Sequence, residues 1–249
     1  MNTLLEAHEV TKTYEKAQRP SLKKVSFSVA AGEFIGIMGA SGSGKTTLLN
    51  VLSTIDVPSG GDILINGINL RRLTGKSAAD FRRDNLGFIF QEYFLLDSLT
   101  IRENISVPLT LQKLSPKKIE GMVLTLAERF GIAPQLDKYP SELSGGQRQR
   151  ASAARAIIKK PSILFADEPT GALDSGSATE LLNTLLEANQ ELDTTILMVT
   201  HDAYAASFTN RILIFKDGQI VKELSKQDGS RHDFYESIAA EVARLDTER

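Results

Sequence analysis

A glycine-rich segment, preceded by an apolar run and followed by helical spacing, has the pattern of a phosphate-binding loop. It reads Gly39-Ala40-Ser41-Gly42-Ser43-Gly44-Lys45-Thr46, with Thr47 next. Glycines let backbone N–H groups wrap around a phosphate chain, and the following helix start adds a favourable dipole. We expect Lys45 to hold the β- and γ-phosphates and the Thr46 hydroxyl to bind Mg²⁺. A loop without a ligand is disfavoured, because such a match arises by chance in about one chain in a hundred.

A second feature is an apolar run that ends in two acidic residues, Asp167 and Glu168. The carboxyl end of a buried strand is where open α/β sheets bind ligands, so Asp167 is expected to hold Mg²⁺ through its hydration shell. Glu168 would then lie beside the γ-phosphate and polarise the attacking water. A strand that merely ends at the surface has the same pattern, but the phosphate loop upstream favours the catalytic interpretation.

A third feature is the segment Leu143-Ser144-Gly145-Gly146-Gln147. Ser144 can cap the helix that follows, and the two glycines permit close approach of an anion. An ordinary capped helix after a turn would have the same pattern. The phosphate loop and the two acids already account for one nucleotide site, however, so a second anion-binding helix start needs a separate use.

The elements that must position these residues alternate between strand and helix. Residues 3–38 are strand-like, and 62–70 has the pattern of a hairpin that turns at Asn66-Gly67. Further strands are predicted from apolar runs at 86–90, 162–166, 195–200 and 211–215. Residues from about 95 to 160 are mostly helical in pattern. This order predicts an α/β fold in which a helical insert interrupts mostly parallel strands.

Four apolar residues share one face of a predicted closing helix over 233–245, namely Phe234, Ile238, Val242 and Leu245. We favour a helix that covers its own domain over one that binds a partner. His8 and His232 are assigned to an edge-strand-like segment and a polar loop, with structural or solvated roles.

Bulk composition suits one large α/β domain or two small ones. Of 249 residues, 41% are hydrophobic and 24% charged, and 29 basic against 31 acidic residues give a net charge of -2. This balance disfavours nucleic acid as a partner, and the absence of cysteine excludes disulfides and thiolate metal sites. No signal peptide or run of roughly 18 apolar residues is present, so we expect any membrane role to depend on a partner.

With these motifs in order, the chain resembles the ABC ATPase family, whose signature is Leu-Ser-Gly-Gly-Gln. The resemblance implies a single ABC ATPase domain over 1–249, with a P-loop NTPase core, a mostly parallel sheet and an N-terminal antiparallel β subdomain. The implied parts are a RecA-like core with the β subdomain at 1–90 and 161–230, a helical signature subdomain at 91–160, and a C-terminal helix at 231–249.

The resemblance also implies roles for single residues. Tyr14 matches the residue that stacks on adenine, Gln91 the loop glutamine near Mg²⁺ and water, and His201 the histidine that contacts the γ-phosphate. The implied catalytic set is Glu168, His201, Lys45 and Gln91. The implied metal ligands are Thr46, Gln91 and Asp167. The implied contacts with ATP are Tyr14, Gly39, Ala40, Ser41, Gly42, Ser43, Gly44, Lys45, Thr46, Thr47, Ser144, Gly145, Gly146 and Gln147.

In the family, the signature of one subunit contacts the γ-phosphate bound by the other. The resemblance therefore implies an ATP-dependent, head-to-tail dimer in which Ser144, Gly145 and Gly146 complete the site of a second copy. The segment Gly171-Ala172-Leu173-Asp174 is similar to the D-loop of that contact, with glycine where serine is common.

A finer resemblance concerns the branch that serves macrolide export, lipoprotein release and peptide resistance, carried by 88–96 and 99–105. Segments 138–156, 165–175 and 234–238 are most similar to the bacitracin-resistance type. This implies a bacterial complex with a membrane permease, the ATPase lying peripherally on the cytoplasmic face, and indirect signalling to a sensor histidine kinase. The alternative is a related lipoprotein-release, macrolide-export or cell-division complex.

The same likeness implies that the permease contacts residues 91–105. Phe94, Leu95 and Leu96 are either contact residues or the local core of the helical insert.

Three other classes fit less well. An ABC ATPase acting on DNA or ribosomes is disfavoured because there is no coiled-coil insertion or second ATPase domain. A scaffold that uses ATP only as a dimer clamp is disfavoured by the presence of Glu168 and His201. An ordinary phosphate-loop kinase leaves the signature unexplained.

Overall fold

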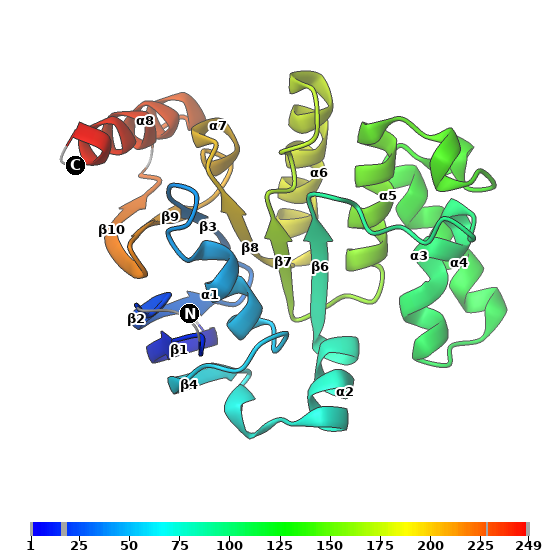
Figure 1. Ribbon diagram of the computed structural model, residues 1–249. Coiled ribbons are helices and arrows are strands. Elements are labelled where there is room, and N and C mark those ends of the chain that lie inside the picture. The colour runs from blue at the N-terminus through cyan, green and yellow to red at the C-terminus, as the bar shows by residue number, and fades with distance from the viewer. Residues whose placement is uncertain (1, 16–18, 228, 248–249) are drawn as a thin grey trace. The chain divides into compact units, whose positions relative to one another are not determined.

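The computed structural model describes residues 2–15, 19–227 and 229–247 (Figure 1). Its contacts divide the chain into a first unit, Met1–Ala78 with Thr195–Arg249, and a second unit, Ala79–Thr194. The predicted helical subdomain, 91–160, lies within the second unit. No helix of the described residues is both long and apolar enough to span a membrane.

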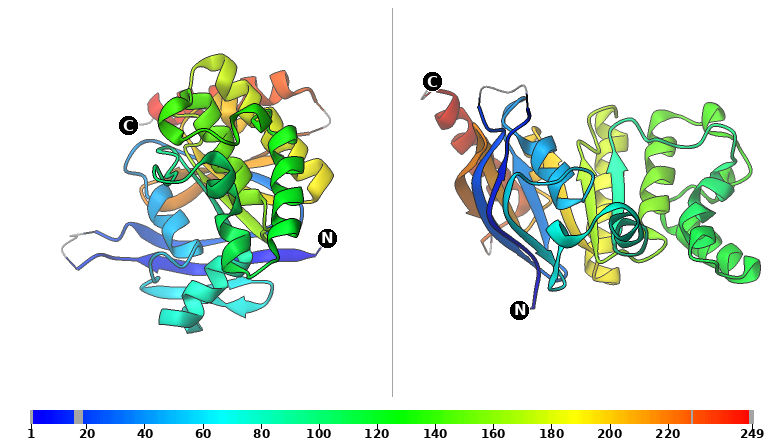
Figure 2. Two further views of the ribbon diagram at one scale, coloured as in Figure 1. Left: turned by 90° about the vertical axis from the view of Figure 1, so that its right-hand side faces the viewer. Right: turned by 60° about the horizontal axis from the view of Figure 1, so that its bottom comes forward.

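An antiparallel sheet occupies the N-terminal part of the first unit, with strand order β2-β1-β4-β5. Its strands are β1 (Thr3–Lys12), β2 (Leu22–Ala30), β4 (Gly60–Ile65) and β5 (Ile68–Asn69). The predicted hairpin turn is confirmed, since Asn66 and Gly67 both have positive φ, 50° and 74°. In the left view of Figure 2, β1 is the long dark-blue strand.

One expectation for this sheet is wrong. His8 lies on β1, which pairs with β2 on one side and β4 on the other, and is therefore not on an edge strand. Alternation of apolar residues shows that a strand has one covered face, but it does not show how many neighbours the strand has. The His8 ring lies 3.1 Å from the Glu6 carboxylate and is exposed to solvent.

A second group of strands in the first unit has the order β10-β9-β3-β8. These are β3 (Phe34–Met38), β8 (Thr195–Thr200), β9 (Arg211–Lys216) and β10 (Gln219–Ser225). β3 pairs in parallel with β8 and β9, while β10 is antiparallel to β9. Every residue of β3 and β8 is buried, as their uninterrupted apolar runs predicted.

The first unit also contains α1 (Lys45–Leu52), the 3₁₀ helix η1 (Leu70–Arg72), α7 (Ala203–Ala206) and α8 (Arg231–Thr247). Helix α2 (Gly75–Asn85) begins in this unit and continues into the second.

The closing helix packs on its own domain, as predicted. Phe234 and Ile238 of α8 are buried in a cluster with Met38, and Val242 and Leu245 pack against the same cluster. Residues 248–249 of the predicted helix lie outside the described residues.

His232 lies within α8, so its assignment to a loop is wrong. The helix starts before the apolar pattern does, because Ser230 and Asp233 form reciprocal bonds at its first turn. The Asp233 carboxylate accepts from the Ser230 N–H at 2.8 Å, and the Ser230 hydroxyl accepts from the Asp233 N–H at 3.2 Å.

The second unit combines a parallel strand pair with helices. The strands are β6 (Leu86–Phe90) and β7 (Ile163–Asp167). The helices are α3 (Ile101–Leu111), α4 (Pro116–Arg129), α5 (Gly145–Ile157) and α6 (Ser175–Leu192), with 3₁₀ turns η2 (Ala133–Gln135) and η3 (Pro140–Glu142). The predicted helical stretch is confirmed, and α5 packs beside β6 (Figure 1).

Candidate functional site

The loop between β3 and α1 contains two glycines whose Cα atoms approach other backbone too closely for a side chain. A Cβ at Gly39 would lie 2.1 Å from the carbonyl oxygen of Phe215. At Gly44, where φ is 107°, a Cβ would lie 2.5 Å from the carbonyl oxygen of Ser21. Any side chain at either position would displace the loop, so its shape depends on glycine.

The turn between β9 and β10 braces this loop. The N–H of Gly218 donates to the carbonyl of Ser43 at 2.9 Å, and the carbonyl of Gly218 accepts from the N–H of Lys23 at 2.8 Å. The loop is thus bonded to the turn and, through the turn, to the antiparallel sheet.

Lys45, the first residue of α1, is only 7% exposed. Its Nζ donates to the carbonyls of Gly39 at 2.7 Å and Ala40 at 2.9 Å. The buried Ser43 hydroxyl has no hydrogen-bond partner in the described part of the chain. A buried ammonium and an unpaired hydroxyl in a glycine loop at a helix start are groups that a phosphate would satisfy, so these residues fit the triphosphate of a nucleotide.

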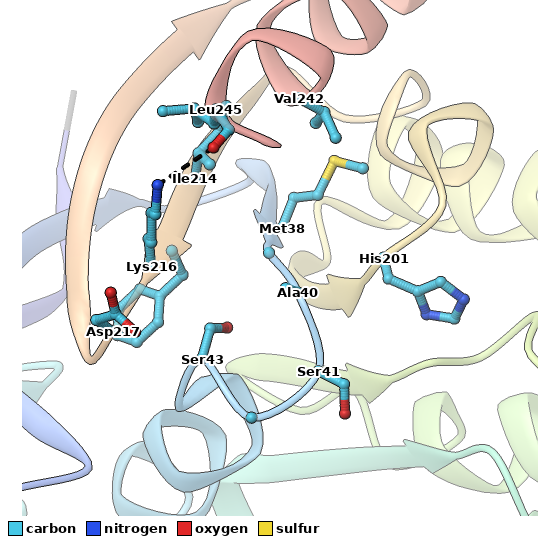
Figure 3. A pocket seen from close by; sticks show the side chains of 13 residues that line it. Met38, Ala40, Ser41, Ser43, His201, Ile214, Lys216, Asp217, Val242 and Leu245 are labelled. Carbon is cyan, nitrogen blue, oxygen red and sulfur yellow. Dashed lines mark hydrogen bonds between the residues drawn. The ribbon is translucent and has the colours of Figure 1, made fainter. Parts of the chain in front are cut away.

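A pocket of about 530 Å³ opens beside this loop, a volume typical of small-molecule sites (Figure 3). Its lining includes residues 38–43, His201 at the end of β8, and 214–217 of β9 and its turn. Val242 and Leu245 of α8 complete it, and Lys216 Nζ donates to the Leu245 carbonyl at 3.2 Å.

The structure therefore brings part of the predicted set into one pocket. Residues 39–43 and His201 share it, and Lys45 is bonded to two of its loop carbonyls. Thr46 and Thr47 occupy the first turn of α1, where Thr46 is exposed. Tyr14 does not line this pocket; it follows β1 and is 41% exposed.

The remaining predicted residues belong to the second unit. Asp167 ends β7, Glu168 follows it, and both are half-buried. Glu168 has a φ of 47°, in the left-handed region that residues with side chains rarely adopt, and its carbonyl accepts from the Gly171 N–H at 3.0 Å. The turn after β7 is thus closed by a backbone bond, which holds Glu168 at the carboxyl end of the strand.

Gln91 leaves the neighbouring strand at the same end. Phe90 on β6 is in register with Asp167 on β7, so Gln91 follows β6 where Glu168 follows β7. A Cβ at Gly171 would lie 3.1 Å from both Cδ and Nε2 of Gln91. The glycine at this D-loop position therefore leaves room for the glutamine side chain.

The signature segment begins α5 with the expected cap. The Ser144 hydroxyl accepts from the Gln147 N–H at 3.3 Å, and Gln147 Oε1 accepts from the Ser144 N–H at 3.0 Å. A Cβ at Gly146 would lie 2.7 Å from the Ser177 hydroxyl at the start of α6, and one at Gly145 would lie 3.1 Å from the Tyr93 hydroxyl. Gly146 is thus needed for packing against α6, whereas at Gly145 only the end of the Tyr93 side chain would have to shift.

Gln149 was not predicted from the sequence. This fully buried residue of α5 donates from Nε2 to the carbonyls of Phe90 at 3.1 Å and Pro169 at 2.6 Å. It therefore ties the segments that carry Gln91 and Glu168 to the signature helix. Its signal in the sequence is a polar residue at helical spacing from buried alanines such as Ala153 and Ala156.

The segment after Gln91 is also held by α5. Arg155 donates to the carbonyls of Phe94 at 2.6 Å and Tyr93 at 2.9 Å, and burial lowers the pKa of this arginine. Tyr93 and Phe94 both have left-handed backbone, with φ of 58° and 46°. Phe94 is 58% and Leu96 48% exposed, so the local-core alternative is wrong for these two residues, while Leu95 is half-buried.

Comparison with known proteins agrees with this geometry. The family described as ABC transporter matches residues 22–171. This chain belongs to the ABC transporter family. The bacitracin export ATP-binding protein BceA of Halalkalibacterium halodurans is 53% identical, over 94% of this chain and 94% of its own length. The ABC transporter ATP-binding protein YxdL of Bacillus subtilis is 49% identical, over 98% and 95%.

Among solved structures, a dimeric post-hydrolysis state of the ATP-binding cassette MJ0796 with ADP and Pi superposes with a TM-score of 0.83. It is 35% identical and covers 90% of this chain and 99% of its own. The predicted α/β fold of ABC ATPases is therefore confirmed. This member of the family is an ATPase subunit of an ABC transporter, and it binds nucleotide.

Proposed function

We propose that this ATPase drives a bacterial membrane permease that protects the cell against bacitracin-like peptide antibiotics, and that it works as a head-to-tail dimer with Mg²⁺-ATP. The observation that carries this proposal is the likeness to BceA over nearly the whole of both chains. The relative's name supplies the substrate class.

In the proposed mechanism, the loop between β3 and α1 binds the phosphates. Its backbone N–H groups would donate to the phosphates. The Lys45 ammonium would exchange its present bonds with the Gly39 and Ala40 carbonyls for bonds to the β- and γ-phosphates. Thr46 and Asp167, with Gln91, would hold Mg²⁺. The metal, when bound, neutralises charge on the phosphates.

Glu168 is the proposed base. Its carboxylate would accept a hydrogen bond from the attacking water and orient it toward the γ-phosphate. His201, which lines the loop pocket, would donate a hydrogen bond to a γ-phosphate oxygen. Gln91 leaves the sheet beside Glu168 and would contact the same water.

The signature would complete the site of the second copy. Ser144 is exposed and begins α5, and its hydroxyl accepts from the Gln147 N–H, so the hydroxyl hydrogen can be donated to a phosphate. Gly145 and Gly146 would add backbone N–H groups at the positive end of the helix dipole. Gln147 supports this arrangement through its bond to the Ser144 N–H.

The proposed contact with the permease lies on Phe94 and Leu96. Both are exposed apolar side chains. The Phe94 carbonyl accepts from Arg155 of the signature helix, and the Leu96 backbone is bonded to the Asn104 side chain of α3. In this arrangement the ATPase lies on the cytoplasmic face of the membrane through the permease. A sensor histidine kinase would be affected only indirectly, through that complex.

Two experiments test the proposal. Glu168→Gln is expected to stop hydrolysis and trap an ATP-bound dimer, visible as earlier elution in size-exclusion chromatography with saturating Mg-ATP. A variant that stays monomeric under these conditions would contradict the shared site. For the substrate class, a deletion strain carrying the wild-type gene should resist bacitracin while the Glu168→Gln strain does not. Altered macrolide sensitivity or lipoprotein release instead would favour the related complexes.

A further inference from the structure

Tyr14 stands at the end of a well-anchored piece of backbone. The N–H of Thr13 donates to the Ser59 hydroxyl at 3.0 Å, and that hydroxyl donates to the Thr13 carbonyl at 3.3 Å. The N–H of Ser59 also donates to the Thr11 carbonyl at 2.8 Å. The chain is thus held in place up to the residue before Tyr14.

Lys12, the last residue of β1, covers one face of this tyrosine. Lys12 Nζ lies 4.8 Å from the centroid of the Tyr14 ring, and only 12% of the Lys12 side chain is exposed. An ammonium group over an aromatic face is attracted by the ring quadrupole, the more so when partly removed from water. Lys12 occupies one face of the ring and Tyr14 is 41% exposed, so a planar partner would stack on the other face.

The ammonium of Lys12 is itself held by the segment after α1. It donates to Asp56 Oδ1 at 2.6 Å and to the Val57 carbonyl at 2.8 Å. Burial raises the pKa of Asp56, but hydrogen bonds from Lys12, the Val57 N–H and Tyr14 outweigh it and lower that pKa, so the carboxylate is charged at neutral pH.

This segment is continuous with the phosphate-binding helix. The N–H groups of Ile55 and Asp56 both donate to the carbonyl of Asn50 on α1, at 3.0 Å each. Helix α1 therefore begins at Lys45, and its last turn is bonded to the backbone of Asp56. The Asp56 carboxylate in turn accepts from the Lys12 ammonium that lies over the Tyr14 ring.

We propose that Lys12, held by Asp56, is a positioning residue that fixes the Tyr14 ring as the platform for the adenine base and ties this platform to the helix that binds the phosphates. The inference rests on the proposed function and on the role that the family resemblance implies for Tyr14, which is to stack on adenine. Lys12 acts only through Tyr14 and does not touch the nucleotide.

The test compares a ligand that has a base with one that lacks it. Binding of Mg-ADP and of Mg-pyrophosphate is measured by calorimetry for wild type, Lys12→Met, Tyr14→Ala and the double variant. Lys12→Met is expected to raise the Kd for ADP by roughly three- to tenfold. The Kd for pyrophosphate should not change, and Lys12→Met should add nothing in the Tyr14→Ala background, because its target is gone.

Three variants serve as checks. Lys12→Arg keeps the cation and should restore most of the ADP affinity. Asp56→Asn keeps the shape of the carboxylate and should weaken ADP selectively, which tests the inference even if Lys12→Met does not fold. Lys24→Met removes an exposed lysine on β2, 3.5 Å from Glu9, and should bind both ligands like wild type.

The outcomes distinguish the inference about Lys12 from the stacking of Tyr14 on adenine. If Tyr14→Ala weakens ADP binding but Lys12→Met and Asp56→Asn do not, the inference about Lys12 is wrong and the adenine platform stands. If Lys12→Met weakens pyrophosphate as much as ADP, the lysine acts on the phosphate loop instead, and the inference is again wrong. If Tyr14→Ala leaves ADP binding unchanged, the proposed platform itself is wrong.

Discussion

The serine that begins the signature helix allows a helix cap and a catalytic contact to be measured separately. In Ser144→Ala the bond from the Gln147 N–H, 3.3 Å long, is lost, while the Gln147 side chain keeps its bond to the backbone of residue 144. Loss of a helix cap costs about 0.5–2 kcal/mol, typically about 1 kcal/mol. A domain with a stability of about 5 kcal/mol or more would remain over about 99% folded.

The expected effect on turnover is larger. If the Ser144 hydroxyl donates to the γ-phosphate of the second copy, its removal loses a hydrogen bond to a charged group, worth about 1.5–3 kcal/mol. At about 1.4 kcal/mol per factor of ten, the rate of ATP hydrolysis should fall roughly 10- to 150-fold. A domain of that stability stays almost fully folded after loss of the cap, so unfolding does not account for such a fall in rate.

The second unit contains a matched control. Helix α3 begins with the same kind of capping box, in which the Thr100 hydroxyl accepts from the Glu103 N–H at 3.2 Å. Thr100→Ala should cost a similar stability, measured by urea unfolding with circular dichroism. Phosphate release by purified Thr100→Ala with Mg-ATP should match wild type. If the two variants hydrolyse ATP at equal rates, Ser144 makes no contact with phosphate and the reasoning fails.

Three further predictions concern other parts of the chain. Gly39→Ala should abolish ADP binding in calorimetry, because the new Cβ would lie 2.1 Å from the Phe215 carbonyl oxygen. Leu96→Asp should keep ADP affinity but lose the permease in a pull-down, since Leu96 is 48% exposed. Burial lowers the pKa of Lys159 to about 8, from 10.5. Between these two pKa values the unfolded chain binds more protons than the folded chain, so the free energy of unfolding should rise as the pH rises from about 8 to 10.5. The rise is at most about 3 kcal/mol, and solvent screening makes it smaller.

Each of these has a control and a contrary result. Gly121→Ala in α4, where a Cβ meets nothing within 4 Å, should bind ADP normally; ADP binding by Gly39→Ala would show that the loop tolerates displacement. Leu124→Asp, also at an exposed leucine (46%), should retain the permease, and wild-type recovery by Leu96→Asp would contradict the contact. Lys159→Met should flatten the alkaline rise in stability; an unchanged slope would mean that Lys159 does not titrate there.

Short-range patterns in the sequence determined much of this protein. Strand β3, the phosphate loop, the cap of α5 and the hairpin at Asn66-Gly67 all follow from residues a few positions apart, because turns, caps and buried strands are local. The two acids at the end of β7 are predicted for the same reason, since an apolar run that ends in Asp167-Glu168 is a local pattern.

Tertiary structure decided what depends on groups far apart in the chain. Glycine is needed at position 39 because the carbonyl oxygen of Phe215 leaves no room for a Cβ. Lys12, which lies over the Tyr14 ring, is bonded to Asp56, a residue distant in the sequence. The role of Gln149 depends on the carbonyls of Phe90 and Pro169, which lie far apart in the sequence. The periodicity of a sequence predicts which face of a helix or strand is buried. It does not predict which distant residues pack against that face, because only the folded chain brings them together.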